Sequence, residues 1–227
     1  MSKLVHLDEL WSQVKEDNIL HYVVPPNLIP SYAILAAEMK KVNRIEVVAK
    51  YFSVNQIVDH YHTWNLWQRN AVLQLIARNI HSVIDSSEYM TLIEFLMALI
   101  LDMCANRELI ATNCGEFFNV VDVLGHFCTT QLKEEILGTR LLKLLADTMV
   151  LFQYDYPHLT EVVHGFLVKI RQLILFMKYD GTADPDLVEN FFSLWCDDSA
   201  IKKRKLWFVR QLACQQNVTS VKSELEQ

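Results

Sequence analysis

The amino-acid sequence predicts an all-α fold, and three observations lead to that prediction. Hydrophobic residues make up 52% of the 227 residues, which is enough for a sizeable core. Glycine and proline are rare, with 5 of each, whereas a sandwich of many short strands needs frequent turns. Apolar residues recur at helical spacing along most of the chain, and no hairpin signal joins two alternating segments. We therefore expect about ten helical segments joined by short connections.

Several helices are expected before residue 105. Apolar residues on one face predict the first of them, and Pro25-Pro26 places an extended linker behind it, because a residue before proline avoids the helical conformation. Asn27 can cap the second helix. The last helix of this group is apolar nearly all round and should be buried at the centre. The expected ranges are 4–18, 27–41, 43–52, 53–62, 67–84 and 86–104.

Residues 106–147 are the most informative part of the chain. A short helix pattern starts at Asn106, and a break follows at Cys114-Gly115. An apolar helix is then expected over Phe117–Phe127, and a longer one from Gln131 to Leu151. One short and two longer helices in about 42 residues is the size of one armadillo-type repeat unit.

The remainder of the chain contains the clearest start signal for a helix. Asp184-Pro185 places Asp at the cap and Pro at the first helical position. Ser199 can cap the last helix. The expected helices cover 158–178, 185–196 and 199–215, and residues 217–227 are expected to form a polar tail that frays. These ranges predict a single helical domain over 1–216 followed by that tail.

Two segments of the chain can be laid over each other. The matched pairs are Asn43-Arg44 with Asn106-Arg107, Ile57-Val58-Asp59 with Val120-Val121-Asp122, and Ala71 with Gly138. A small residue at the last position lets neighbouring helices approach closely. Over residues 43–151 the pattern resembles the armadillo repeat, which implies a right-handed stack of helices with a binding groove. A less regular HEAT-like stack and a globular helical bundle remain as alternatives.

Candidate chemistry is sparse. Glu161 and His164 share a helix face, but a di-iron site needs a second such pair and two further glutamates. His60 and His62 point in different directions on a helix and lack a third ligand. The sequence also contains no phosphate-binding glycine loop and no nucleophile elbow. We therefore expect no catalytic residue, no metal, no cofactor and no small-molecule substrate.

Charge and cysteine content narrow the class of partner and the compartment. The formal net charge is −6, which disfavours nucleic acid as the main partner. The most hydrophobic stretch, residues 90–104, contains Glu94 and Asp102, so no membrane span is expected. None of the 5 cysteines forms a CxxC pair and no secretory signal precedes them, which favours the nucleus or the cytoplasm.

Lys202, Lys203, Arg204 and Lys205 form the one dense basic run of the sequence. A short basic cluster can serve as a nuclear import signal. It falls in the first turn of an expected helix, where positive charge opposes the helix dipole, and this suggests that the run has a use. The alternatives are a solvated helix face, pairing with the acidic remainder of the chain, and contact with an anion or a nucleic acid.

The resemblance to armadillo repeats implies that the third helix of each unit lines a groove that holds a partner peptide or helix. We expect Trp207 and Phe208 to seal the end of the stack. The predicted function is that of an adaptor for a protein partner, and the alternative is a constitutive subunit of a larger complex. The residues expected to bind the partner are Trp64, Trp67, Arg69, Asn70, Gln74 and Arg78 in one unit, and Lys133 and Arg140 in the next.

Overall fold

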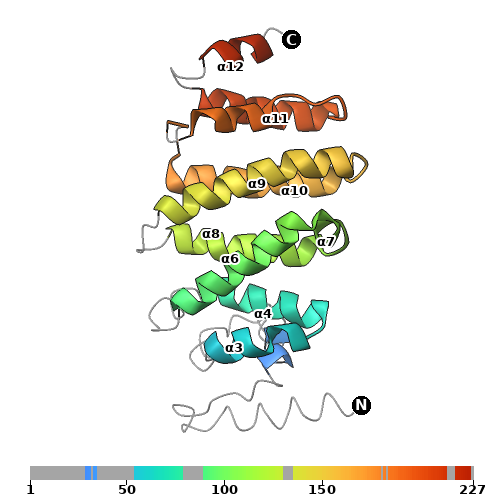
Figure 1. Cartoon of the computed structure of the whole chain (residues 1–227), viewed down its shortest axis with the longest axis vertical. Coiled ribbons are helices and arrows are strands. Elements are labelled where there is room, and N and C mark those ends of the chain that lie inside the picture. The colour runs from blue at the N-terminus through green and yellow to red at the C-terminus, as the bar shows by residue number, and fades with distance from the viewer. Residues whose placement is uncertain are drawn as a thin grey trace, which may run out of the picture.

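The computed structural model describes residues 29–31, 33–34, 54–78, 89–129, 135–179, 181–182, 184–213 and 218–225 (Figure 1). Every element within these residues is a helix, so the expected all-α class is confirmed for the part of the chain that is described. The helices expected over 4–18 and 43–52 lie outside the described residues, and only residues 29–31 and 33–34 of the one expected over 27–41 are included.

Most of the expected helices are present with shifted ends. The elements are α3 (Val54–His60), η6 (Tyr61–Thr63), α4 (Leu66–Arg78), α6 (Tyr89–Ala105), α7 (Arg107–Thr112), α8 (Cys114–Thr129), α9 (Glu135–Asp155), α10 (Thr160–Met177), η7 (Pro185–Phe191), α11 (Ser199–Leu212) and α12 (Val218–Leu225). Of these, η6 and η7 are 3₁₀ helices.

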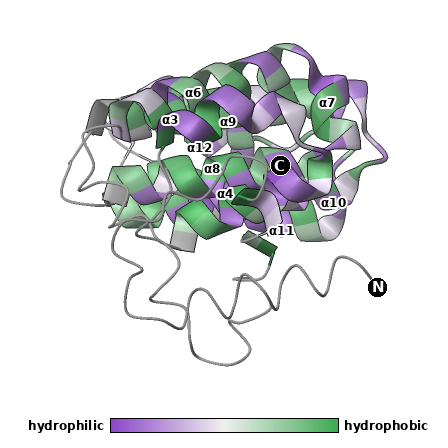
Figure 2. Cartoon of the chain, turned by 90° about the horizontal axis from the view of Figure 1, so that it is seen from below, coloured by the Kyte–Doolittle hydropathy of each residue, from purple (hydrophilic) through white to green (hydrophobic). Residues whose placement is uncertain are grey.

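The helices form two rows that run along the long axis of the molecule (Figures 1 and 2). The first row consists of α3, α6, α9 and η7, and the second row consists of α4, α8, α10 and α11. Within the second row, α4 packs on α8, α8 on α10, and α10 on α11. Across the rows, α6 packs on α8, α9 on α10, and η7 on α11. The chain therefore passes from one row to the other with each hairpin.

The core lies between the rows and is rich in aromatic side chains. The Phe117 ring of α8 and the Phe152 ring of α9 both lie against Phe166 of α10, with centroids 5.1 Å and 5.9 Å from it. All three rings are fully buried. Burying one such side chain stabilises a fold by about 1.5–3 kcal/mol. Because the cluster contains side chains of both rows, it stabilises the packing of one row against the other.

The sequence overlay of residues 43–84 on 106–151 does not match the observed stacking. It pairs α3 with α8, and α4 with α9, but the members of each pair lie in different rows. The neighbour of α4 in its row is α8, and Asn119 Nδ2 donates a hydrogen bond of 2.7 Å to Asn70 Oδ1 between them. The overlay is wrong by one helix, because apolar helices with short connections look alike when only local patterns are compared.

The helix expected over 185–196 is also wrong in type and length. The structure has the 3₁₀ helix η7, followed by a loop that reaches Asp198. Asp184 makes no side-chain capping bond there, since its Oδ2 accepts a hydrogen bond of 2.6 Å from Lys143 Nζ. The cap of α11 is Asp198 rather than Ser199, and its Oδ1 accepts from Ala200 N and Ile201 N at 2.8 and 2.7 Å.

The C-terminal segment is helical where the sequence predicted a frayed tail. Residues Val218–Leu225 form α12, and Val221 is buried. Glu224 Oε1 accepts a hydrogen bond of 2.8 Å from Ser193 N in the loop after η7. Burial of Val221 and this long-range hydrogen bond help to hold the polar segment, and neither leaves a periodic signal in the sequence.

Candidate interaction surface

The two tryptophans predicted to bind a partner differ in their surroundings. Trp64 is 6% exposed, and its ring centroid lies 6.2 Å from that of Tyr61. Trp67 is 64% exposed on the first turn of α4. Trp64 is therefore a core residue, which corrects its assignment to the partner-binding set, and Trp67 alone keeps a surface available for contact.

Arg69 binds its own chain rather than facing a partner. Its Nε donates a hydrogen bond of 2.9 Å to the carbonyl oxygen of Trp64. Its Nη2 donates to the carbonyl oxygen of His62 at 3.3 Å, and its Nη1 lies 3.5 Å from Glu116 Oε1. The guanidinium carbon is also 5.5 Å from the centre of the Tyr61 ring. These contacts fix the loop before α4, so Arg69 has a structural role.

Glu116 and Tyr61 complete this network inside the fold. Tyr61 Oη donates a hydrogen bond of 2.7 Å to Glu116 Oε1, and both side chains are buried. Burial raises the pKa of the Tyr61 hydroxyl, and the neighbouring Glu116 carboxylate raises it further. Tyr61 therefore stays protonated and donates its hydrogen bond. Burial of the Glu116 carboxylate would otherwise destabilise the fold, but Tyr61 and Arg69 both interact with it.

The rest of the predicted partner-binding set is divided between the two rows. Trp67 and Gln74 share a face of α4 because they are seven residues apart, but Asn70 bonds to Asn119. Arg140 is exposed on α9, in the other row. The side chain of Arg78, and the whole of Lys133, lie outside the described residues. The described members of the predicted set therefore lie on helices of different rows and not on neighbouring helices of one row.

Lys205 cannot act as part of an exposed basic signal. Its side chain is 0% exposed, and its Nζ lies 2.9 Å from Asp197 Oδ2 and 3.4 Å from the carbonyl oxygen of Phe192. Asp197 also accepts hydrogen bonds from Gln153 Nε2 at 2.7 Å and from Leu194 N at 2.8 Å. Burial lowers the pKa of Lys205, and the ion pair with Asp197 opposes that shift. Of the four residues predicted to form a nuclear import signal, only Lys202, Lys203 and Arg204 are exposed.

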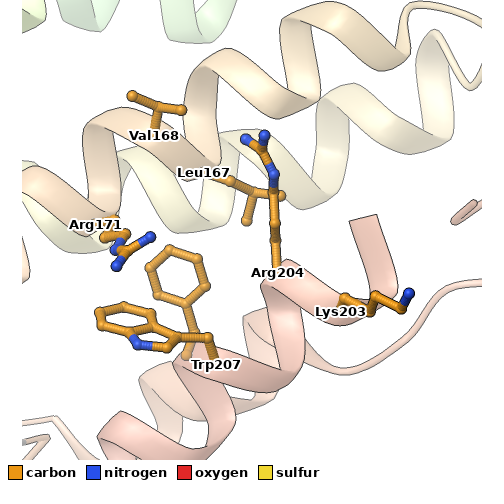
Figure 3. A pocket seen from close by; sticks show the side chains of 7 residues that line it. Leu167, Val168, Arg171, Lys203, Arg204 and Trp207 are labelled. Atoms are coloured by element: carbon orange, nitrogen blue, oxygen red, sulfur yellow. The ribbon is translucent and has the colours of Figure 1, made fainter. Parts of the chain in front are cut away.

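A hollow of about 370 Å³ lies between α10 and α11 (Figure 3). Arg171 from α10 and Trp207 from α11 lie side by side, with the guanidinium carbon 4.8 Å from the ring centre. The Arg204 side chain extends from α11 toward Leu167 of α10 (Figure 3). The hollow is lined by Leu167, Val168, Arg171, Lys203, Arg204, Trp207 and Phe208. We call it the basic hollow.

A second hollow, of about 250 Å³, lies between α8 and α10. Its lining contains Asp122 and Lys169, which form an ion pair in which Nζ donates to both carboxylate oxygens at 2.6 and 2.7 Å. His126 and Phe176 line the same hollow. Charge is balanced within this neutral hollow, in contrast to the basic one.

Exposed apolar side chains of α10 lie along the two hollows, since Val168 lines the basic hollow and Phe176 lines the neutral one. Val168, Leu175 and Phe176 are all exposed, and Phe176 is 56% exposed. The buried side chains of α10 lie on its other side, against α8 and α9. We call these three residues the α10 ridge. A ridge of apolar side chains flanked by hollows on both sides is typical of a surface that contacts another protein.

Charge is distributed unevenly along the stack. Together, α10 and α11 carry seven Lys or Arg residues and one acidic residue, Glu161, in a chain whose net charge is −6. Lys205 is buried and Lys169 is paired with Asp122, but five of these cations are exposed against the single exposed carboxylate of Glu161. The first row carries more exposed carboxylates, among them Glu94, Asp102, Asp147 and Asp186. The outer side of α10 and α11 is therefore a positive region on an acidic protein.

The histidine and carboxylate pairs singled out in the sequence do not assemble into a metal centre in the described residues. No group of three His, Cys, Asp or Glu side chains there has the geometry to hold an ion. His60 Nδ1 lies 3.1 Å from the carbonyl oxygen of Gln56, and the His62 ring packs edge-on against Phe95. Among these residues, no helix is long and apolar enough to cross a membrane.

Comparison of the chain with protein-family models, with curated proteins and with solved structures gave no match. The arrangement of helices and the chemistry of the second row are therefore the basis for any functional inference.

Sequence reasoning identified part of this surface and missed the rest. It singled out Lys203, Arg204 and Trp207, although it assigned Trp207 to the end of the stack. It overlooked Arg171 and the α10 ridge. The available signal was the position of Val168 and Leu175, one heptad apart and off the apolar stripe that runs through Phe166 and Ile170.

Proposed function

We propose that this protein is a scaffold of stacked helical hairpins that holds a segment of a partner protein on the outer side of α8, α10 and α11. The observation that carries the proposal is the α10 ridge with a hollow on each side. The proposed binding surface lies on the second row, instead of in the groove between α4 and α9 that the sequence suggested. In solenoid proteins each hairpin contacts its neighbours, and the resulting extended surface is commonly used to bind partners.

The size and chemistry of the ridge support protein binding. Leu175 and Phe176 are each more than half exposed. Burying an apolar side chain of this kind contributes about 1.5–3 kcal/mol, and a few such residues dominate the energy of an interface. Polar and charged side chains from both hollows surround the ridge, as the rim of an interface does.

The proposal can be tested by photo-cross-linking from the full-length chain. A benzophenone amino acid is placed at Val168 in one variant and at Leu101 in the other, since Leu101 is a comparably exposed apolar residue on the first row. We expect a specific cross-linked protein from position 168 and none from position 101. That protein is then identified by mass spectrometry and purified.

Binding of the purified partner gives the decisive result. Phe176→Ser should weaken it by about tenfold or more, because a central apolar anchor contributes at least about 1.4 kcal/mol, whereas Leu101→Ser should leave it unchanged. Circular dichroism and the melting temperature serve as controls for folding. Equal cross-linking from both rows, or equal loss of affinity in both variants, would contradict the proposed surface.

A constitutive subunit of a larger complex is a second candidate, favoured by exposed apolar residues on the first row. Leu151 and Tyr154 are about half exposed near the end of α9, and Trp195 is 78% exposed in the loop before α11. An isolated subunit with several such surfaces would self-associate, whereas a scaffold would remain monomeric. Size-exclusion chromatography with light scattering separates these two functions.

We also propose that the protein works in the nucleus or the cytoplasm. Among the described cysteines, Cys104, Cys114, Cys128 and Cys196 form no disulfide, which is typical of a reducing compartment. With Lys205 buried, nuclear import through the basic run would have to rely on Lys202, Lys203 and Arg204. Replacing these three residues by Gln in a fluorescently tagged chain, and comparing nuclear accumulation with that of Arg210→Gln, tests that route.

A further inference from the structure

We propose that the basic hollow binds an acidic segment of the partner protein, with carboxylates on Arg171, Lys203 and Arg204 and one apolar side chain against Val168 and Trp207. This inference rests on the proposed function, because it specifies the chemistry of the partner that the second row would hold. It assigns a use to the part of the basic run that stays exposed.

Charge is the first argument. Arg171, Lys203 and Arg204 are exposed around one hollow, and none of the described residues that line it is acidic. Among the same residues, none of the three cations has an acidic group within ion-pair distance, whereas Lys169 and Lys205 each have one. Three neighbouring cations without a counter-charge attract an anionic group, and arginine can bind carboxylates through two parallel hydrogen bonds.

The floor of the hollow supplies the second argument. Leu167 and Phe208 are buried beneath it, whereas Val168 is exposed in its lining and the Trp207 ring is half-buried with Arg171 over one face. An inorganic anion would leave Val168 and the exposed part of Trp207 uncovered. A peptide that alternates acidic and apolar side chains would cover these two side chains and pair with the cations at the same time.

The limited extent of the basic region favours a peptide over a nucleic acid. Axes of packed helices lie about 8–10 Å apart, so a hollow between two of them spans about three residues of extended chain at about 3.3 Å each. Beyond it, Lys169 is neutralised by Asp122, and Glu161 lies in the first turn of α10. A nucleic acid would need a longer run of cations to bind its phosphates.

The test uses the full-length chain and a defined probe. The probe is a pool of fluorescein-labelled heptapeptides in which four positions are Asp or Glu and three are varied among apolar residues. A matched pool carries Asn and Gln in place of Asp and Glu. Fluorescence anisotropy should give binding of the acidic pool at least about tenfold tighter than that of the neutral pool, and the difference should shrink at high salt.

A matched pair of variants localises the effect. Arg171→Glu with Arg204→Glu reverses two charges at the hollow, and Arg140→Glu with Arg210→Glu reverses two exposed charges elsewhere. We expect the first variant to weaken binding of the acidic pool by about tenfold or more and the second by less than about twofold. Equal weakening by both variants would overturn the inference, since it would show attraction by net charge alone.

Two other results would also overturn it. One is the absence of binding by the acidic pool. The other is tighter binding of a single-stranded oligonucleotide of the same charge, lost in the Arg171→Glu, Arg204→Glu variant. If cross-linking from Val168 and the effect of Phe176→Ser persist, either result still agrees with the proposal that the α10 ridge binds a partner. Loss of those effects as well would reject the proposed function itself.

Discussion

At the scale of single residues, the structure separates side chains that the sequence treats alike. Trp64 and Trp67 are three positions apart with the same local chemistry, yet one is buried and the other exposed. An import signal would need the whole basic run from Lys202 to Lys205 to be exposed, but the Lys205 side chain is buried. Exposure at such positions depends on which elements fold over them, and this information is spread along the chain.

The two tryptophans give the first prediction. Trp64→Ala should lower the free energy of unfolding by about 3–5 kcal/mol, because it removes a large buried side chain and leaves a cavity. Trp67→Ala should change it by less than about 0.5 kcal/mol, as expected for an exposed position. Urea unfolding measures both values. A larger loss for Trp67→Ala than for Trp64→Ala would contradict the placement of α4.

The buried Lys205–Asp197 pair gives the second prediction. Lys205→Met should lower stability by about 3–5 kcal/mol, because Asp197 would keep a buried charge without its cation. The double variant Asp197→Asn, Lys205→Met should be less destabilised than Lys205→Met alone, since neither charge remains. A double-mutant cycle by urea unfolding measures this coupling, and strict additivity would show that the two groups do not interact.

Cys104 gives the third prediction. Burial raises the pKa of this thiol to about 11 from 9.0. Because the raised pKa favours the protonated form in the folded state, the associated stability is complete below about pH 9 and is lost as the pH rises toward about 11. Iodoacetamide at about pH 8 should therefore modify the half-buried Cys114, Cys128 and Cys196 before Cys104, as read by mass spectrometry. Fast modification of Cys104 in the folded protein would refute this order.

At the scale of helices, two glycines allow neighbouring helices to pack closely. The side chain opposite one glycine is rigid, and the side chain opposite the other is flexible. A Cβ atom added at Gly165 of α10 would overlap the Phe118 ring of α8, and one at Gly138 of α9 would overlap the end of the Met177 side chain. The Phe118 ring packs against both Phe117 and Phe166, so it has little freedom to move. The Met177 side chain is flexible and half-buried.

These neighbours predict opposite outcomes for the same substitution. Gly165→Ala should lower stability by about 1–3 kcal/mol through overpacking. Gly138→Ala should be near neutral, because a gain in helix propensity of about 1 kcal/mol offsets the shift of Met177. Thermal unfolding of both variants provides the measurement. If Gly138→Ala proves the more damaging change, the packing of α9 on α10 differs from that described.

The existence of most helices could be predicted from the sequence, but their arrangement could not. Apolar periodicity depends only on residues close together in the sequence. It predicted most of the described ends of α6, α9 and α10 to within a few residues. The failure at η7 arose because Asp184 bonds to Lys143, a residue far away in the sequence, instead of capping a helix. The row of each helix is decided by contacts such as Asn70 with Asn119, which a single sequence does not reveal.

At the scale of the whole molecule, two rows of helices produce a surface with segregated charge. The outer side of α10 and α11 is basic apart from Glu161, whereas Glu94, Asp102, Asp147 and Asp186 belong to the first row. The hollows and the α10 ridge exist because α8, α10 and α11 are successive neighbours in one row. The candidate site thus depends on the stacking, and the sequence overlay missed the site because it placed α4 beside α9.

The stacking order is tested most directly by cross-linking of engineered cysteines. The Asn70 and Asn119 side chains lie within hydrogen-bond distance on α4 and α8, so a short thiol-specific cross-linker should join Asn70→Cys to Asn119→Cys. Gln74→Cys with Arg140→Cys would bridge α4 and α9, as the sequence-based groove requires, and should not. We expect mass spectrometry to detect the first cross-linked peptide, and formation of the second in place of the first would contradict the two-row order.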